Sequence, residues 1–184
     1  MRITRPPMPP RRIQPATDTA LFLDVDGVLC PVHSLETDPG WGPVTVIDDP
    51  GFGELAISLD MAAALMGAPV ELMWCTDWQD IANMAFAPYL GQALPHLTRP
   101  WEAENRWWKL DAIHHYLDTH TQIRRFIWID DHLDLPEEDG EPRSTHAARE
   151  FQQRGVPGFL IAPEKTVGLT KKDWDRATDW LRDP

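Results

Sequence analysis

The stretch "LFLDVDGVLC", residues 21–30, places two carboxylates directly after an apolar run. Asp24 and Asp26 are separated by one residue, and Gly27 follows them at once. An ionised carboxylate is costly to bury without a partner. The stretch therefore indicates either a strand that delivers charged groups to a working site or an ordinary strand that meets an acidic turn, and the rest of the chain must decide.

Two later apolar runs also end in polar residues. "VELMWCTD" ends in Thr76 and Asp77, "RFIWIDD" ends in Asp130 and Asp131, and Lys109 precedes the second of these runs. Carboxylates crowded together repel one another strongly unless a cation lies between them. Because Mg²⁺ prefers oxygen ligands and pairs with phosphate-bearing substrates, the pattern favours a magnesium site that serves phosphoryl transfer.

Parallel strands would bring these residues to one edge of a sheet. Apolar runs begin at Ala20, Val70, Arg125 and Gly158, and none alternates cleanly between apolar and polar residues. Near-continuous apolar runs separated by helical segments are typical of parallel strands buried on both faces. Functional groups of such sheets gather beyond the carboxyl ends of the strands. We therefore predict an α/β fold with a central parallel sheet flanked by helices.

The intervening segments predict helices and a hairpin. Apolar spacing indicates helices over Ser58 to Met66, over Glu104 to Leu117, and after a cap at Thr170. A turn-rich stretch between two β-prone pieces predicts a flap hairpin at about residues 40–57, just after the first strand. Neither this segment nor the one before Lys109 has room for a large inserted domain.

The tryptophans divide into two groups. Four are assigned to the core by their place in strands or on helical stripes, namely Trp74, Trp107, Trp128 and Trp174. On a helical wheel Trp108 falls almost opposite the apolar face of its helix. It joins Trp41, Trp78 and Trp101 as candidates that line a substrate cleft, with surface packing as the alternative.

The acidic and basic residues are similar in order and spacing to known motifs. "DVDGVL" from Asp24, the strand that ends in Thr76, Lys109 and "IDD" ending in Asp131 resemble the four motifs of the haloacid dehalogenase (HAD) superfamily. The finer pattern, with "WKLDAI", "WIDDHL" and "GLTKKDW", resembles the HAD domain of Swiss Army Knife RNA repair proteins. The resemblance spans most of the chain and implies a Rossmann-like phosphatase of the capless type.

The resemblance also implies roles for individual residues. Asp24 would be the nucleophile that forms an aspartyl phosphate, and Asp26 would act as general acid and then general base. Thr76 and Lys109 would bind the phosphoryl group and stabilise its charge. Gly27 would let the chain turn sharply beside the phosphate.

The implied metal ion is Mg²⁺. Asp24, Asp130 and the backbone carbonyl of Asp26 would ligate it, and Asp131 would act through a water.

The predicted substrate-binding residues are Gly27, Thr76, Asp77, Lys109 and Trp108. Asp77 and Trp108 add to the phosphate-binding residues that are named above.

Each of these roles has a structural alternative. Thr76 could be a β-branched residue that merely ends a strand, and Lys109 could be a surface lysine whose stem covers apolar surface. Asp130 and Asp131 could belong to the acidic loop that follows them. His132 is assigned to that loop rather than to catalysis.

Composition limits the function classes. The 184 residues predict a single HAD-like domain over 18–184 behind a flexible Arg/Pro-rich leader at 1–17. The net charge of −12 disfavours broad binding to nucleic acid. No apolar stretch approaches the ~20 residues that cross a bilayer, and the leader lacks the apolar core of a secretory signal. We therefore predict a cytoplasmic protein without membrane contact, in which Cys30 and Cys75 are reduced.

The leading hypothesis is a magnesium-dependent phosphomonoester hydrolase, with a terminal phosphate of RNA or DNA as the specific substrate. The absence of a large cap favours a macromolecular phosphate or closure by another subunit, so self-association and repair partner proteins enter the prediction. One alternative is a phosphatase of small metabolites or nucleotides. The other is a catalytically silent HAD-fold module that binds proteins.

Overall fold

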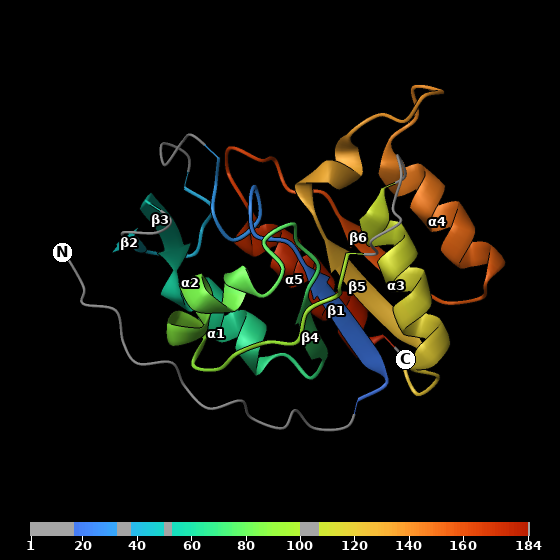
Figure 1. The fold of residues 1–184 in the computed structure, drawn as a ribbon, viewed down its shortest axis with the longest axis horizontal. Coiled ribbons are helices and arrows are strands. Elements are labelled where there is room, and N and C mark those ends of the chain that lie inside the picture. The colour runs from blue at the N-terminus through green and yellow to red at the C-terminus, as the bar shows by residue number, and fades with distance from the viewer. Residues whose placement is uncertain (1–16, 33–37, 50–52, 100–106, 184) are drawn as a thin grey trace.

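A parallel four-stranded sheet forms the centre of the fold. The computed structural model describes residues 17–32, 38–49, 53–99 and 107–183. The strands lie in the order β4-β1-β5-β6, and every neighbouring pair is parallel (Figure 1). Their bounds are Thr19–Leu23 for β1, Glu71–Trp74 for β4, Arg125–Ile129 for β5 and Gly158–Ile161 for β6. The prediction of an α/β fold with a central parallel sheet is confirmed.

Helices cover both faces of this sheet. One apolar cluster joins the sheet to α1, α2 and α5, and another joins it to α3 and α4, which lie together on the right in Figure 1. The helices span Leu59–Gly67 (α1), Ile81–Leu90 (α2), Trp108–Thr119 (α3), Arg143–Gln153 (α4) and Lys171–Arg182 (α5). None of the helices in the described part of the chain is long and apolar enough to cross a membrane.

Alternate residues of the strands enter opposite clusters. Leu21 and Leu23 of β1 belong to the cluster with α1, whereas Ala20 and Phe22 belong to the cluster with α3. All four are fully buried, because successive side chains of a strand point to opposite faces and both faces are covered. This explains why the strand sequences show no apolar–polar alternation.

The predicted hairpin is present after β1. Strands β2 (Val44–Asp49) and β3 (Gly53–Ser58) pair antiparallel as a separate two-stranded sheet. Trp41, which precedes the hairpin, is 4% exposed, and its Nε1 donates a hydrogen bond to the carbonyl of Leu169 at 2.6 Å. The ring of Trp41 therefore anchors the hairpin to the segment before α5 rather than lining an open cleft.

Side chains cap the first turns of α1 and α5, and the cap predicted at Thr170 is present. Ser58 accepts a hydrogen bond from the backbone N–H of Met61 and begins α1, and Thr170 accepts one from Asp173 and begins α5. Helix α3 begins at Trp108, and residues 104–106 of the predicted helix lie outside the described residues.

The acidic stretch at 130–141 is not entirely a loop, and a helix follows it. A 3₁₀ turn covers Asp131–Asp134, and α4 begins at Arg143. Helix α4 was not predicted from the sequence, because its N-cap is Pro142, which offers no side-chain acceptor to the first turn.

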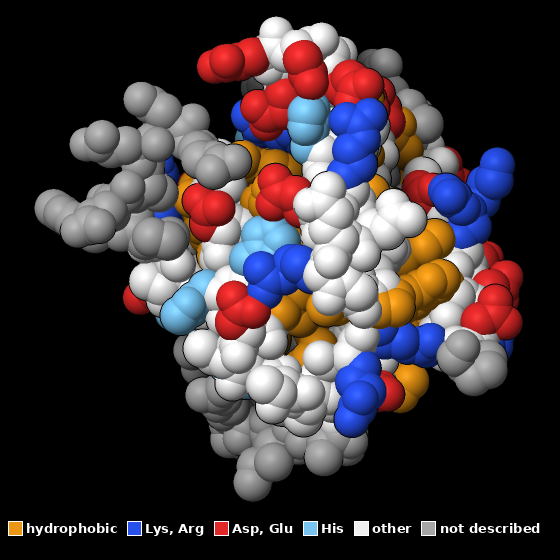
Figure 2. Space-filling view, turned by 90° about the vertical axis from the view of Figure 1, so that its right-hand side faces the viewer, with side chains coloured by type: hydrophobic (Ala, Val, Ile, Leu, Met, Phe, Trp, Pro, Cys, Tyr) orange, Lys and Arg blue, Asp and Glu red, His pale blue; other side chains and the backbone are white. Residues whose placement is uncertain are grey.

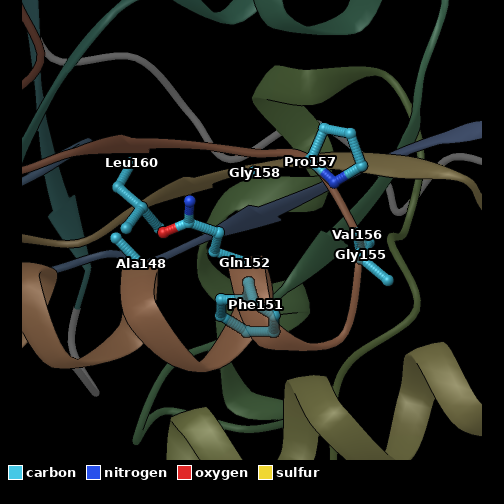
Figure 3. A pocket seen from close by; sticks show the side chains of 8 residues that line it. All are labelled: Ala148, Phe151, Gln152, Gly155, Val156, Pro157, Gly158 and Leu160. Atoms are coloured by element: carbon cyan, nitrogen blue, oxygen red, sulfur yellow. The ribbon is translucent and has the colours of Figure 1, made fainter.

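A shallow apolar hollow of about 400 Å³ lies between α4 and β6 (Figure 3). Phe151 and Gln152 of α4 line it, and the side chain of Gln152 extends toward Leu160 of β6. The hollow reaches the amino end of β6, whereas the polar residues predicted to do chemistry follow the carboxyl ends of the strands. It therefore plays no part in the candidate site.

Candidate active site

Two buried carboxylates meet one buried ammonium at the carboxyl edge of the sheet. Asp24 follows β1 and Asp130 follows β5, and the parallel pairing of Leu23 with Ile129 brings them side by side. Lys109, in the first turn of α3, places Nζ 2.5 Å from Asp24 Oδ2 and 2.7 Å from Asp130 Oδ2. We call Asp24, Lys109 and Asp130 the interior cluster. Lys109 is 1% exposed, so its alternative assignment as a surface lysine was wrong.

Backbone donors hold the other oxygen of each carboxylate. The N–H of Val25 donates to Asp24 Oδ1 at 2.8 Å, and the N–H of His132 donates to Asp130 Oδ1 at 3.0 Å. Each carboxylate thus has one oxygen on the backbone and the other on Lys109. Because the donors belong to the turns that end β1 and β5, the carboxylates are oriented before any substrate binds.

The interior cluster carries surplus negative charge. Burial raises the pKa of Asp130 to about 7, against the opposing effect of Lys109. Burial by itself would lower the pKa of Lys109, but the carboxylates of Asp130 and Asp24 raise it above its ordinary value. One ammonium balances only one of the two carboxylates, so the site has an electrostatic need for a further cation.

Gly27 lets Asp131 approach the turn after β1. Its φ is +67°, and a Cβ at this position would lie 2.7 Å from Asp131 Cγ, closer than real Cβ contacts allow. Asp131 is half-buried, its Oδ1 is buried without a hydrogen-bond partner among the described residues, and burial raises its pKa. The predicted sharp turn is present, and the space that a side chain would fill is occupied by this carboxylate.

Thr76 ends the neighbouring strand at the same edge. Cys75 extends the pairing of β4 by donating its N–H to the carbonyl of Leu23 at 2.8 Å, and Thr76 follows at 1% exposure. Thr76 Oγ1 accepts a hydrogen bond from the N–H of Trp78 at 3.3 Å. That bond uses a lone pair and leaves the hydroxyl hydrogen for donation to a ligand.

Asp26 lies on the exposed side of the site. Its carboxylate is outside the network of Lys109, and Trp78 Nε1 donates to Asp26 Oδ2 at 2.8 Å. The turn after β1 therefore presents Asp24 to the interior and Asp26 to solvent. Sequence reasoning did not foresee the contact of Trp78, because it joins residues that are 52 positions apart.

Asp77 and Trp108 form a second indole–carboxylate pair. Trp108 Nε1 donates to Asp77 Oδ1 at 2.9 Å, and Arg99 Nη1 lies 3.6 Å from the same oxygen. Trp108 is only 5% exposed and packs in the α3 cluster, so its placement opposite the apolar face was wrong. A helical wheel could not predict this burial, because Trp108 is contacted by Asp77 from the segment after β4. Trp101 lies outside the described residues.

A second group of charged side chains lies around the start of α4. Asp139, Glu141 and His146 could together contact an ion, as could the three consecutive residues Asp130, Asp131 and His132 after β5. Arg149 Nη1 lies 2.6 Å from Glu141. We call Asp139, Glu141, His146 and Arg149 the surface cluster; Figure 2 shows acidic, basic and histidine side chains interspersed on the face that includes α4.

These features define a class of protein. A parallel sheet that presents an aspartate after β1, a threonine after β4 and an aspartate after β5, with a lysine from a helix between them, is the arrangement of a HAD-type hydrolase site.

Comparison with known families identifies the branch of that class. The chain belongs to the family described as the HAD domain in Swiss Army Knife RNA repair proteins, which it matches over residues 20–174. Comparisons with curated proteins and with solved structures found no match. The resemblance inferred from the four motifs is confirmed, and family membership supports a phosphatase-type hydrolase.

Proposed function

We propose that this protein is a magnesium-dependent phosphomonoester hydrolase that works through an aspartyl phosphate on Asp24. The observation that carries the proposal is the interior cluster, in which Lys109 bridges Asp24 and Asp130 within hydrogen-bond distance. A buried carboxylate held by a backbone N–H and an ammonium is oriented for attack. A purely structural ion pair would not require a second buried carboxylate with surplus charge.

The reaction takes place in two displacements. A carboxylate oxygen of Asp24 attacks phosphorus, the bond from phosphorus to the leaving oxygen breaks, and Asp26 gives its proton to that oxygen. Water then attacks the phosphorus of the aspartyl phosphate, and Asp26 takes a proton from it. The bond to Asp24 breaks, and inorganic phosphate and the free carboxylate result.

Thr76 and Lys109 stabilise the transferred group. The Thr76 hydroxyl donates to a phosphate oxygen, and the Lys109 ammonium balances the charge that gathers on phosphorus and on Asp24. Both side chains are almost fully buried, so their donors act at low dielectric, where they are worth more than in water.

The residues of the site fit a magnesium ion. Asp24, Asp130 and the carbonyl of Asp26 would hold it directly, and Asp131 Oδ1, which has no partner in the described part of the chain, would accept from a water on the ion. These ligands are all oxygens, and the surplus negative charge of the interior cluster favours a cation. When bound, Mg²⁺ shields the anionic phosphate from the anionic nucleophile.

The proposed substrate is a terminal phosphate on RNA or DNA. The family's association with RNA repair supports it, as does the exposed position of Asp26 and Asp77, which leaves the leaving-group side accessible to a bulky ester. Asp77 and Gly27 would contact the substrate, and Trp108 would act by orienting Asp77. Small phosphate esters are the alternative; the cytoplasmic location, self-association and repair partners stay predictions.

The proposal is tested by hydrolysis of an aryl phosphate with and without Mg²⁺. Activity should require the ion and should fall by at least about a thousandfold in Asp24→Asn, which removes the nucleophile. Asp139→Asn, a matched change in the surface cluster, should keep wild-type activity. Full activity in purified Asp24→Asn would contradict the mechanism.

A substrate panel then separates the alternatives. Oligonucleotides phosphorylated at the 3′ or the 5′ end, mononucleotides and sugar phosphates would be compared by kcat/KM, with preference for an oligonucleotide expected. A folded wild-type protein that hydrolyses none of these substrates with Mg²⁺ would favour the catalytically silent binding module.

A further inference from the structure

We propose that Trp78 is a positioning residue that holds the carboxylate of Asp26 in the orientation needed for proton transfer. The inference rests on the proposed function, because it assigns a task to a side chain that touches the general acid rather than the substrate. It adds a specific contact between two strand ends to the roles that the family motifs imply.

Asp26 needs such a contact more than its neighbours do. Asp24 and Asp130 are buried, and each is held by a backbone N–H and by Lys109. Asp26 is exposed, and an exposed side chain loses rotamer entropy when it is held in one orientation. The hydrogen bond from Trp78 Nε1 to Asp26 Oδ2, at 2.8 Å, offsets that cost.

Trp78 is itself held in place by the turn after β4. Its backbone N–H donates to Thr76 Oγ1, and its ring lies 5.8 Å from the ring of Phe86, a fully buried residue of α2. Gln79, at a φ of +50°, donates from Nε2 to the carbonyl of Thr76 at 2.8 Å. The same turn therefore supplies the phosphate-binding hydroxyl and the indole that orients Asp26.

The indole is suited to this task by its chemistry. Indole Nε1–H is a donor only, so it fixes Asp26 Oδ2 as an acceptor and does not compete for the catalytic proton. When Asp26 is protonated, its proton is then directed to Oδ1. Oδ1, which accepts no hydrogen bond from the residues that the structure describes, would face the leaving group in the first displacement and the attacking water in the second.

The dependence on leaving group tests this role. A poor leaving group such as an alkoxide needs protonation in the transition state, whereas nitrophenolate hardly does. Trp78→Phe keeps an aromatic ring but removes the donor. It should lower kcat/KM for a nucleoside phosphate by roughly tenfold to a hundredfold and for p-nitrophenyl phosphate by less than about threefold.

Trp74→Phe is the matched control. Trp74 Nε1 donates to Asn83 Oδ1 at 2.9 Å, so this substitution removes an equivalent indole hydrogen bond from a neighbouring buried residue outside the site. It should leave the ratio of the two kcat/KM values unchanged. In an Asp26→Asn background, Trp78→Phe should cause no further loss, because the group that it positions no longer transfers a proton.

A second measurement does not depend on turnover. In protein labelled with ¹⁵N-tryptophan, the indole N–H resonance of Trp78, assigned by its loss in Trp78→Phe, should move more in Asp26→Ala than the other indole resonances do. An unmoved resonance, or an equal loss of kcat/KM on both substrates in Trp78→Phe, would overturn the positioning role. Failure of the proposed function is a separate result, namely full activity in Asp24→Asn.

Discussion

The interior cluster and the surface cluster contain the same kinds of side chain in opposite surroundings. The interior cluster has two aspartates around Lys109, and all three side chains are at most 6% exposed. The surface cluster has Asp139 and Glu141 around His146 and Arg149, with side chains 33% to 55% exposed. The two clusters are alike in the kinds of charged residue that they contain, and they differ in how far the side chains are exposed to solvent.

The pKa values of the buried Asp130 and the exposed Asp139 are shifted in opposite directions. Burial raises the pKa of Asp130 to about 7, so the folded protein binds the Asp130 proton more tightly than the unfolded chain does. The backbone N–H of Glu141 lowers the pKa of Asp139, so the folded protein favours its charged form. The buried carboxylate of Asp130 costs stability, which is typical of a group that has a function. The exposed carboxylate of Asp139 is solvated by water, so it gives no such indication of function.

The two clusters also differ in how the chain assembles them. Lys109 is 85 residues from Asp24 and 21 from Asp130, whereas His146 is 7 residues from Asp139 and Arg149 is 8 from Glu141. The surface cluster follows from one turn and the start of one helix. The interior cluster exists only when β1, β5 and α3 are packed together.

Removal of the central cation should have the largest effect on stability. Lys109→Met leaves two buried carboxylates without their ammonium and should destabilise the protein by about 3–5 kcal/mol in urea unfolding, in addition to abolishing hydrolysis. Arg149→Met in the surface cluster should leave the urea midpoint nearly unchanged, because water solvates the freed carboxylate. Equal midpoints for the two variants would remove the distinction between the clusters.

Each cluster has a glycine with positive φ beside it, and these glycines give a second, smaller contrast. Gly27→Ala combines a strained φ with a Cβ that would overlap Asp131, and we expect a loss of roughly 2–3 kcal/mol and at least tenfold of activity. Gly140, at a φ of +83°, has open space around it, so Gly140→Ala should cost only the backbone strain of about 1–2 kcal/mol. Unfolding and aryl phosphate assays measure both effects, and unchanged activity in Gly27→Ala would contradict the close approach.

The smallest predicted effect is a pH dependence of opposite sign in the two clusters. Asp130 binds its proton more tightly in the folded state, so its stability contribution is present below its unfolded pKa and is lost as the pH rises through about 7. Without Mg²⁺, Asp130→Asn should therefore raise the melting temperature by roughly 3 °C at pH 8 and by less at pH 5.

Asp139 provides the reverse case for the same measurement. Its pKa is lowered in the folded state, so its contribution is present above its unfolded pKa and is lost as the pH falls. Asp139→Asn should therefore lower the melting temperature at pH 8, and the difference should shrink at acidic pH. A pH dependence of the same sign in Asp130→Asn and Asp139→Asn would contradict the contrast between buried and exposed carboxylates.

Much of the fold could be predicted because its signals are local. The four apolar runs, the cap at Thr170 and the flap hairpin each depend on neighbouring residues, and each has its counterpart in the structure. Helix α4 was not predicted, because it begins after Pro142 without a side-chain cap, whereas α5, which also buries only two side chains, begins at the cap of Thr170. A local signal such as a cap therefore identified a helix whose buried face is narrow.

The sequence was enough to name residues of the candidate site, but it was not enough to predict the contacts between them. The order of Asp24, Thr76, Lys109 and Asp130 along the chain was enough to suggest a common edge of the sheet. The position of Trp108 was misjudged, since a helical wheel describes one face while packing acts on every side. The bond from Trp78 to Asp26 has no counterpart in the local sequence.

The sequence by itself determined the parallel sheet, the residues at its carboxyl edge and the family, because apolar runs and motif order are properties of the chain. Only the tertiary structure decided that Lys109 lies between Asp24 and Asp130, that Asp131 fills the space beside Gly27, and that an indole holds Asp26. The physical reason is that hydrogen bonds and charge interactions act over a few ångströms. Those distances are set when strands and helices pack, not by separation along the chain.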